Sequence, residues 1–479
     1  MTKKVWIGRT VHPPGILLVS CLLLLFTGCT ASRMQTRLPL EAQGVVYLYL
    51  KTVSPEAGRL LFTLAHVAAV KENGEETPLS INVEEISTRS VSRERLLASG
   101  ELPPGRYRGF LFKVDKASLA GEEDNAALQS PEESSTVDAP FVVTRKRANV
   151  FSLTFQYAES FRGGVIFNPR FTVAPPVQPP TGITGYVVNR GANTITVFDK
   201  VTGRVTGVIP TGANPGAMAI NPVVQSRAYL AVTGEDAVDV IDLFLGETID
   251  RIRLFGGDRP LEMALTPDGK TLLVVNSGSN TVSLFDVVSL NELARLRVGN
   301  DPRSIVLDAT GRRGYVFNTG GNTISVIDVP NRLVAATIAT ESGPLRGQFN
   351  RKGDRLYVIH QWSSFLLVID PVSLVVVRRQ QIGMGFQVLK VDPVTDWLYM
   401  ARKGGNEVEI FDPFTLVAGI SFRTGGEVAY MTLDGQERTL VMVMPESRTV
   451  RIINLIRSGI RAEIDVEDDP SWVTVMGER

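Results

Sequence analysis

Short runs of apolar and β-branched residues fill the second half of the chain, and they are separated by turns at regular distances. In one unit the runs are Leu261–Leu265, Thr271–Val275, Thr281–Asp286 and Leu293–Val298. The intervening segments 266–270 and 276–280 are rich in Gly, Asn and Asp, which accept positive φ or close a local turn through their side chains. Runs of five or six residues bounded by such turns predict β-strands.

The same unit recurs along the chain, and its third run ends in an acidic or amide residue. These marks are Asp199, Asp242, Asp286, Asp328, Asp370, Asp412 and Asn454. Neighbouring marks are 42 to 44 residues apart. Four strands in a unit of this length are typical of a propeller blade, which has to stack on neighbours to bury its two faces.

The two ends of the repeat array complement each other. The first unit lacks its opening strand, whereas an unmatched strand-like run, 469–475, ends the chain. Pro470 follows Pro260 by 210 residues, which is five periods of 42. We therefore expect an all-β fold in which the C-terminal strand completes the first blade and closes a seven-bladed β-propeller.

Two sequence motifs carry a family resemblance. The segment Asn276-Ser277-Gly278-Ser279-Asn280-Thr281-Val282-Ser283, with Gly299-Asn300-Asp301-Pro302 after the fourth run, resembles the YVTN repeat of YncE-like bacterial and archaeal propellers. The resemblance covers residues 183–477 of a predicted propeller domain 183–479, and it weakens in later units, where Phe386 and Val428 hold the Pro position. It implies the ring but not its task, because such rings serve many functions.

A second domain precedes the array. The Pro-rich segment 175–182 predicts a stiff linker, and residues 40–174 contain further strand-like runs, which predict a β-sandwich. The runs are Val45–Leu50, Arg59–Val67, Gly109–Val114, Phe141–Val143, Val150–Phe155 and Gly164–Phe167. The segment 96–107, with Pro103-Pro104-Gly105, resembles an uncharacterised β-sandwich family of bacterial lipoproteins.

The N-terminal segment predicts a lipoprotein signal peptide, residues 1–28. Lys3, Lys4 and Arg9 precede the apolar run Gly15–Gly28, which at about 21 Å as a helix is too short to span a membrane. Residues 25–29, LFTGC, resemble a lipobox, with Phe26 where the family usually has Leu; this implies lipidation and cleavage at Cys29. The alternatives are an ordinary secretory signal with a chance cysteine and a short anchor helix.

These features predict a location in the cell envelope. Residues 29–39 would tether the chain to a membrane through the lipidated Cys29, and Thr30, in place of Asp, indicates the outer rather than the inner membrane in a Gram-negative cell. The mature chain would keep no second cysteine, so no disulfide is expected. Without the three basic residues of the signal, 47 basic residues face 50 acidic ones, and nothing suggests a nucleic-acid partner.

Candidate chemistry is sparse, and we expect no cofactor and no metal. There is no CxxCH motif for covalent haem attachment and no GxSxG motif. The mature chain has only His66, in an apolar run, and His360, which ends the second strand of the fifth unit. The acidic segment 121–138 could bind calcium, but a solvated loop is the more ordinary interpretation, because it lacks EF-hand spacing.

Residues on one face of the ring are the candidate binding residues. The loops after the fourth strand and between the second and third strands share this face. Its channel-mouth candidates are Glu262, Arg303, Arg346, Tyr430 and Trp472, and its loop candidates are Arg190, His360, Trp362, Arg402, Lys403 and Arg448. Trp and Arg are enriched at binding hot spots, although each could be an ordinary surface group.

The sequence therefore predicts a non-enzymatic binding or scaffolding lipoprotein that recognises a protein or a small molecule at one propeller face. A propeller hydrolase of the lactonase kind is the main alternative, although no catalytic motif of that family is matched. A structural spacer is a third interpretation.

Overall fold

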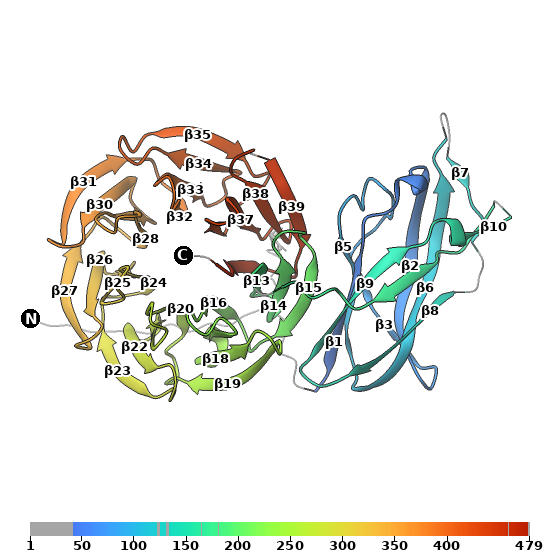
Figure 1. Cartoon of the computed structure of the whole chain (residues 1–479), viewed down its shortest axis with the longest axis horizontal. Coiled ribbons are helices and arrows are strands. Elements are labelled where there is room, and N and C mark those ends of the chain that lie inside the picture. Colours follow the sequence, from blue (N-terminus) through green and yellow to red (C-terminus); the bar gives the residue numbers. More distant parts are fainter. Residues whose placement is uncertain are drawn as a thin grey trace, which may run out of the picture. The chain divides into compact units, whose positions relative to one another are not determined.

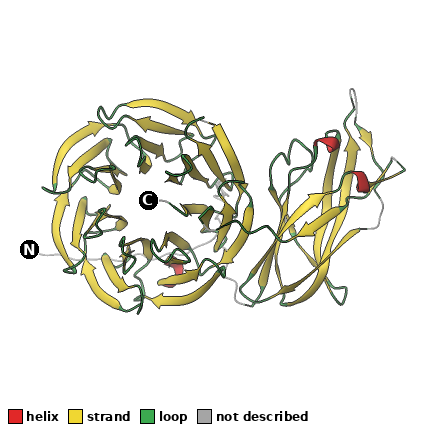
Figure 2. Cartoon of the chain, viewed as in Figure 1, coloured by secondary structure: helices red, strands yellow, loops and turns green. Residues whose placement is uncertain are grey.

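Strands dominate the part of the chain that the computed structural model describes, residues 42–121, 125–130, 134–163, 165–180, 182–457 and 459–477. Helical structure in these ranges is confined to the 3₁₀ turns Pro55–Ala57, Ala158–Ser160 and Thr233–Glu235. Figure 2 shows this contrast, with strands in yellow and the short turns in red. The all-β prediction is confirmed. The predicted signal peptide, Cys29 and the tether 29–39 lie outside the described residues.

The N-terminal module consists of two five-stranded sheets. One has the order β12-β9-β1-β5-β4 and the other β3-β2-β6-β7, with β8 paired to β6. The strands are β1 Gly44–Leu50, β2 Leu60–Lys71, β3 Glu76–Pro78, β4 Ser80–Ile81, β5 Arg95–Leu102, β6 Gly105–Leu119, β7 Ala126–Ala127, β8 Ser135–Val143, β9 Ala148–Phe155 and β12 Phe171–Ala174. A two-stranded hairpin, β10 Phe161–Arg162 with β11 Ile166–Phe167, lies beside them.

Both sheets of the N-terminal module contribute to one apolar core. Val46 and Leu48 of β1 are buried together with Phe110 and Phe112 of β6. The tyrosine hydroxyl of Tyr107, in the turn-and-strand segment after Pro103-Pro104, donates a 2.9 Å hydrogen bond to the Pro103 carbonyl and fixes the entry of β6. Alternating apolar residues on facing sheets thus bury each other, which is the physical requirement for a stable pair of sheets.

Four-stranded antiparallel sheets make up the rest of the described chain. In chain order their strands are β13 Thr184–Asn189, β14 Thr194–Asp199 and β15 Val205–Pro210; β16 Pro215–Ile220, β17 Arg227–Val232, β18 Ala237–Asp242 and β19 Glu247–Arg253; β20 Pro260–Leu265, β21 Thr271–Asn276, β22 Thr281–Asp286 and β23 Glu292–Arg297; β24 Pro302–Leu307, β25 Arg313–Asn318, β26 Thr323–Asp328 and β27 Leu333–Ala339; β28 Pro344–Phe349, β29 Leu356–His360, β30 Phe365–Asp370 and β31 Val375–Gln381; β32 Phe386–Val391, β33 Leu398–Arg402, β34 Glu407–Phe411 and β35 Ala418–Arg423; β36 Tyr430–Asp434, β37 Thr439–Met444, β38 Thr449–Asn454 and β39 Gly459–Asp465; and β40 Pro470–Val475. Figure 1 shows these sheets around a ring. The innermost strand is the first of its sheet in chain order, except in the sheet that begins with β13, where β40 is innermost.

The last strand of the chain pairs with the first strand of the array. β40 runs antiparallel to β13, with Val473 opposite Val187, and the sheet has the order β15-β14-β13-β40. A buried ion pair adds to this junction: the Lys200 ammonium lies 2.5 Å from the Asp434 carboxylate and donates to the Met476 carbonyl at 2.8 Å. The pairing agrees with the expectation drawn from the phase of Pro470.

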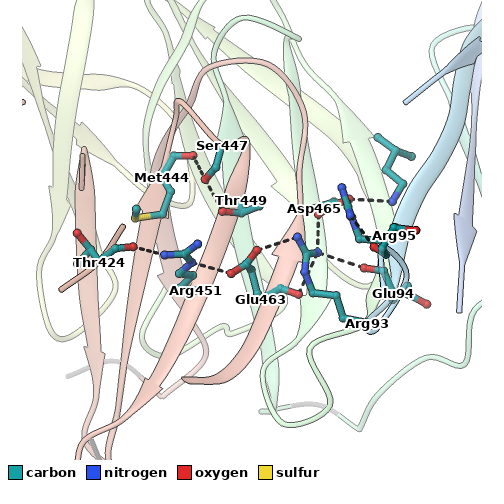
Figure 3. A network of polar contacts seen from close by, with 12 residues as sticks. Arg93, Glu94, Arg95, Thr424, Met444, Ser447, Thr449, Arg451, Glu463 and Asp465 are labelled. Carbon is teal, nitrogen blue, oxygen red and sulfur yellow. Dashed lines mark hydrogen bonds and ion pairs between the residues drawn. The ribbon is translucent and has the colours of Figure 1, made fainter. Parts of the chain in front are cut away.

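Charged groups join the N-terminal module to the ring at the outer strand β39 (Figure 3). Arg93 donates to both Glu463 and Asp465, and Arg95 donates to Asp465 at 2.7 Å. Glu463 also accepts from Arg451 of β38, 2.7 Å away. An apolar cluster continues this joint, because Tyr47 and Tyr49 of β1 pack in the same buried group as Val205 and Val208 of β15.

Candidate functional site

The same register position of each inner strand supplies one layer of the central channel. The position lies two residues after the start of each inner segment. These segments start at Pro215, Pro260, Pro302, Pro344, Phe386, Val428 and Pro470. The layer contains Ala217, Glu262, Ser304, Arg346, Val388, Tyr430 and Trp472. All seven of these residues are of different types, whereas the strands that carry them repeat, so the layer is where one unit is distinguished from the next.

Arg346 crosses the centre of this layer. Its Nη1 lies 2.8 Å from Glu262 Oε2, on a strand two sheets away, and the side chains are 24% and 8% exposed. Its guanidinium carbon also lies 5.0 Å from the ring centroid of Tyr430 and 5.4 Å from that of Trp472. One cation therefore contacts residues of three other sheets across the ring.

Tyr430 and Trp472 form the aromatic side of the layer. Their ring centroids are 3.8 Å apart and their planes are inclined by 20°, a stacked arrangement. The Trp472 indole N–H donates to the Met218 carbonyl at 3.1 Å, and the Lys390 ammonium lies 5.1 Å from the Tyr430 centroid. Stacked rings flanked by cations gain from the negative faces of the π systems.

The surroundings of Arg346 favour its charged form. Burial by itself lowers the pKa of Arg346, but the neighbouring Glu262 carboxylate and Tyr430 outweigh it, so that the pKa of the guanidinium lies above its ordinary value. Glu262 Oε1 accepts a further 3.2 Å hydrogen bond from the backbone N–H of Ile305. The two charged side chains of the layer therefore pair with each other. We refer to the cluster of Glu262, Arg346, Tyr430 and Trp472 as the plug.

A cavity of about 500 Å³ adjoins the plug. Its walls come from the later residues of β16, β20 and β24, including Ala219, Ala264 and Val306, and Trp472 also lines it. Gln225 and Gln436, on the turns between first and second strands, line its mouth. The lining residues are uncharged, so that the cavity suits a small, neutral ligand with an apolar body and hydrogen-bonding groups.

His360 is part of the blade interior. It is 2% exposed, and its Nδ1 lies 3.0 Å from the Phe365 carbonyl oxygen. Its Nε2 is buried, and none of the described residues is its hydrogen-bond partner. Burial lowers the pKa of His360 to about 4, against a weaker opposite effect of the Phe365 hydrogen bond. A neutral imidazole closing the turn between two strands is therefore the state that the fold favours.

The loop candidates divide into bound and exposed side chains. Arg402 donates to Glu409 at 2.7 Å and to the carbonyls of Met384 and Ile382, and it stacks 3.9 Å above the Phe386 ring. Trp362 is 52% exposed and Lys403 is exposed as well.

The three remaining rim arginines form ion pairs at the surface, and Arg190, whose side chain is 46% exposed, pairs with Asp469 at 2.7 Å. The Arg448 side chain is 60% exposed in a 2.9 Å ion pair with Asp468, and Arg303 pairs with Asp301 at 2.9 Å. Together with Trp362 and Lys403, Arg448 is the part of the loop group that is open to a partner.

Two residues of these clusters were not among the sequence candidates. Lys390, which faces Tyr430, lies two positions after the channel layer on β32, and Glu409 is the third-strand residue opposite the second-strand residue Met400. The repeat register could have identified Glu409 as the partner of Arg402. The equivalent residues Ser283 and Ser325 also bind the last residue of the second strand.

Two kinds of feature are absent from the described residues. Within the ranges given above, no group of three or more His, Cys, Asp and Glu side chains has the arrangement of a metal site. In the same ranges no helix is long and apolar enough to cross a membrane.

A ring of four-stranded antiparallel sheets with the inner strand first is a β-propeller. More narrowly, the family described as YNCE-like beta-propeller matches residues 194–396, and the chain carries a YncE-like β-propeller fold. The search of curated proteins found no match.

Solved structures show the same architecture. The hydrazine synthase of Kuenenia stuttgartiensis shares 20% identity over 58% of this chain and 94% of that chain, with a TM-score of 0.52. A functionally unknown protein from Desulfotomaculum acetoxidans shares 13% identity over 62% and 99%, with a TM-score of 0.55. The dihydro-heme d1 dehydrogenase NirN shares 15% over 63% and 77%, with a TM-score of 0.50. At these identities the likeness concerns the fold alone.

Proposed function

We propose that this chain is a lipoprotein of the cell envelope, acylated at Cys29, whose ring is a seven-bladed β-propeller that binds a ligand without transforming it. The seven four-stranded sheets, with β40 completing the first, support the blade number. Two five-stranded sheets around one core support a β-sandwich as the N-terminal module. The lipobox-like residues 25–29 support the membrane anchor, with the outer membrane as the address in a Gram-negative cell.

The observation that carries the binding function is the cavity beside Trp472. It is lined by uncharged residues and adjoins the plug, in which Glu262 and Arg346 already neutralise each other. Such a site offers shape, apolar contact and amide groups, which favour binding of a small neutral molecule. The exposed loop residues Trp362, Lys403 and Arg448 are a second proposed contact surface, for a protein partner.

Filling the cavity tests this proposal. Ala264→Phe places a ring in the cavity, and Ala127→Phe, at an exposed position of β7, is the matched control. The wild-type protein and both variants are incubated with a small-molecule extract of the envelope, desalted and examined by native mass spectrometry. We expect a retained ligand with the wild type and the control, and none with Ala264→Phe at an unchanged melting temperature.

Two results would contradict the proposal. Equal retention by all three proteins would exclude the cavity as the site. Recovery of a hydrolysed form of the ligand would establish the lactonase-like alternative in place of binding without turnover.

A further inference from the structure

The turns between the third and fourth strands share one geometry. In the turn after β22, the Asp286 carboxylate accepts from the backbone N–H of Val288 at 3.1 Å and of Ser289 at 2.7 Å. The marks Asp199, Asp242, Asp370, Asp412 and Asn454 each accept the corresponding two bonds. The mark therefore closes the turn through its own side chain.

The residue two positions after the mark is apolar and points into solvent. Five of these side chains are almost fully exposed: Phe244 89%, Val288 86%, Val372 82%, Phe414 85% and Ile456 74%. Val201 is 38% exposed and Pro330 holds the position in the remaining turn. The turn uses only the backbone N–H of this residue, and an exposed side chain buries no area on folding. Folding therefore does not account for apolar residues at this position.

These residues lie on one face of the ring. Third strands run in the same direction in every sheet and the fourth strand is the outermost, so that their connecting turns follow the perimeter of a single face (Figure 1). We call Phe244, Val288, Val372, Phe414 and Ile456 the apolar crown. A single exposed apolar side chain is ordinary, but a set repeated around one face matches a flat apolar surface.

The described chain begins beside this face. The Gln43 carbonyl accepts from the Lys146 N–H at 2.9 Å, and the next residue, Arg147, forms an ion pair with Glu247. Glu247 opens β19 directly after the turn that carries Phe244 and the 56% exposed Leu245. Cys29 precedes Gln43 by 14 residues, which span at most about 50 Å when extended.

We propose that the apolar crown docks on a lipid surface and turns this face of the propeller toward the membrane. Three of the same turns add an exposed arginine, Arg204, Arg332 and Arg457, suited to the phosphate level of a headgroup layer. The choice of a membrane as the occupant rests on the proposed anchoring at Cys29. The opposite face, with Trp362, Lys403 and Arg448, would then be free for partners.

Site-specific fluorescence tests the docking without any acyl chain. In a chain that begins at Thr30, and therefore lacks Cys21, Cys29 and the apolar run 15–28, reporter cysteines are introduced as Val288→Cys or Phe414→Cys in the crown and as Ser279→Cys on the opposite face. Each is labelled with bimane and mixed with vesicles of phosphatidylethanolamine and phosphatidylglycerol that contain brominated acyl chains. We expect quenching of the two crown labels and none of the label at position 279.

Affinity gives a second measurement. The triple variant Phe244→Ser, Phe414→Ser, Ile456→Ser should bind vesicles about tenfold more weakly, because it loses the apolar area that enters the interface. Trp362→Ser, an exposed aromatic on the opposite face, is the matched control and should bind like the wild type.

Several results would overturn the docking. These are unquenched crown labels, equal quenching at position 279, or vesicle binding unchanged in the triple variant. Concentration-dependent self-association that the triple variant abolishes, without a vesicle response, would identify a second copy as the occupant. Failure of acylation alone would leave these measurements unaffected, because the tested protein carries no acyl chain.

Discussion

The last residue of the second strand forms hydrogen bonds in several sheets, but its residue type and its partners differ between them. In three sheets it is an asparagine whose amide donates to two hydroxyls of the third strand, as Asn276 does to Thr281 and Ser283. Arg402 and His360 hold the same position in later sheets and reach a carboxylate or a backbone carbonyl instead. The unusual residue type therefore reflects local hydrogen bonding as much as recognition.

His360 should make stability depend on pH. Its folded pKa of about 4 lies below the ordinary 6.5, so that the unfolded chain binds the proton first as the pH falls. The free energy of unfolding should decrease between about pH 6.5 and 4, by at most about 3 kcal/mol. His360→Asn, which copies the other sheets, should remove this dependence in chemical denaturation measured across that range.

His66→Asn, the same substitution at a side chain that is 39% exposed, is the control for the change of residue type. A pH profile of His360→Asn that coincides with the wild type would show that the histidine is not buried neutral.

Breaking the channel ion pair should be costly. Glu262→Ala leaves the Arg346 guanidinium in the channel without its carboxylate, and we expect about 3 kcal/mol of destabilisation. Arg303→Ala removes an exposed ion pair from the neighbouring strand and should cost less than about 1 kcal/mol. Urea denaturation measures both, and equal losses would contradict the assignment of the pair as the plug.

At the scale of elements, β40 has the largest expected effect. It is the inner strand of its sheet, pairs with β13 and carries Trp472 of the channel layer. Ending the chain before Pro470 should expose the β13 edge and lower thermal stability well beyond the ~1 kcal/mol of a typical substitution. Ending the chain at Gly477 keeps β40 and should melt like the full chain; similar melting of both truncations would disprove closure by this strand.

The exposed turn residues on the opposite face can be removed without touching a strand. A combined Trp362→Ala, Lys403→Ala, Arg448→Ala variant should keep its melting temperature and lose a protein partner that the wild type captures from envelope extract. Arg402 is left intact, because its bonds to Glu409 and two carbonyls hold the loop together. Unchanged capture would place the partner surface elsewhere.

At the scale of the whole molecule, the ion pairs of Arg93 and Arg95 attach the N-terminal module to the outer strand β39 of the ring. Asp465 accepts from Arg93, Arg95 and the Leu96 N–H, so that one carboxylate of β39 binds three donors of the module. The ring-closing strand β40 follows β39 directly in the chain. The module is therefore bound next to the junction between the last and the first sheet.

Cys29→Ser tests the proposed anchor. Without the thiol no acyl chain can be attached, and we expect the variant to appear unprocessed or in the soluble fraction after a salt and carbonate wash. Thr30→Ser, which keeps the cysteine, is the control and should remain in the membrane fraction. Membrane retention of Cys29→Ser equal to that of the control would refute lipidation as the anchor.

The sequence by itself determined the all-β class, the four-stranded make-up of the repeated unit and the partner of the last strand. These follow from short-range causes: alternation decides which side of a strand is buried, and Asn, Asp and Gly decide where it turns. Exact periodicity also brought Glu262, Arg346, Tyr430 and Trp472 to one predicted channel mouth, because equal register positions on inner strands meet at the axis. Arg303, predicted at the same place, is one position off this layer and pairs with Asp301 at the surface. The strand β5 is missing from the predicted runs, because Ser99 and Gly100 interrupt its apolar pattern and local alternation is the only signal that the sequence offers.

Only the tertiary structure decided which of those groups pair. Arg346 meets Glu262 across 84 positions of sequence and Arg93 meets Asp465 across 372. Such contacts depend on the curvature of the ring and on the way the N-terminal module is bound to it, and no local pattern encodes either. The same holds for exposure: Trp362 and Arg402 look alike as loop residues, but packing leaves the first in solvent and binds the second to Glu409 and Phe386.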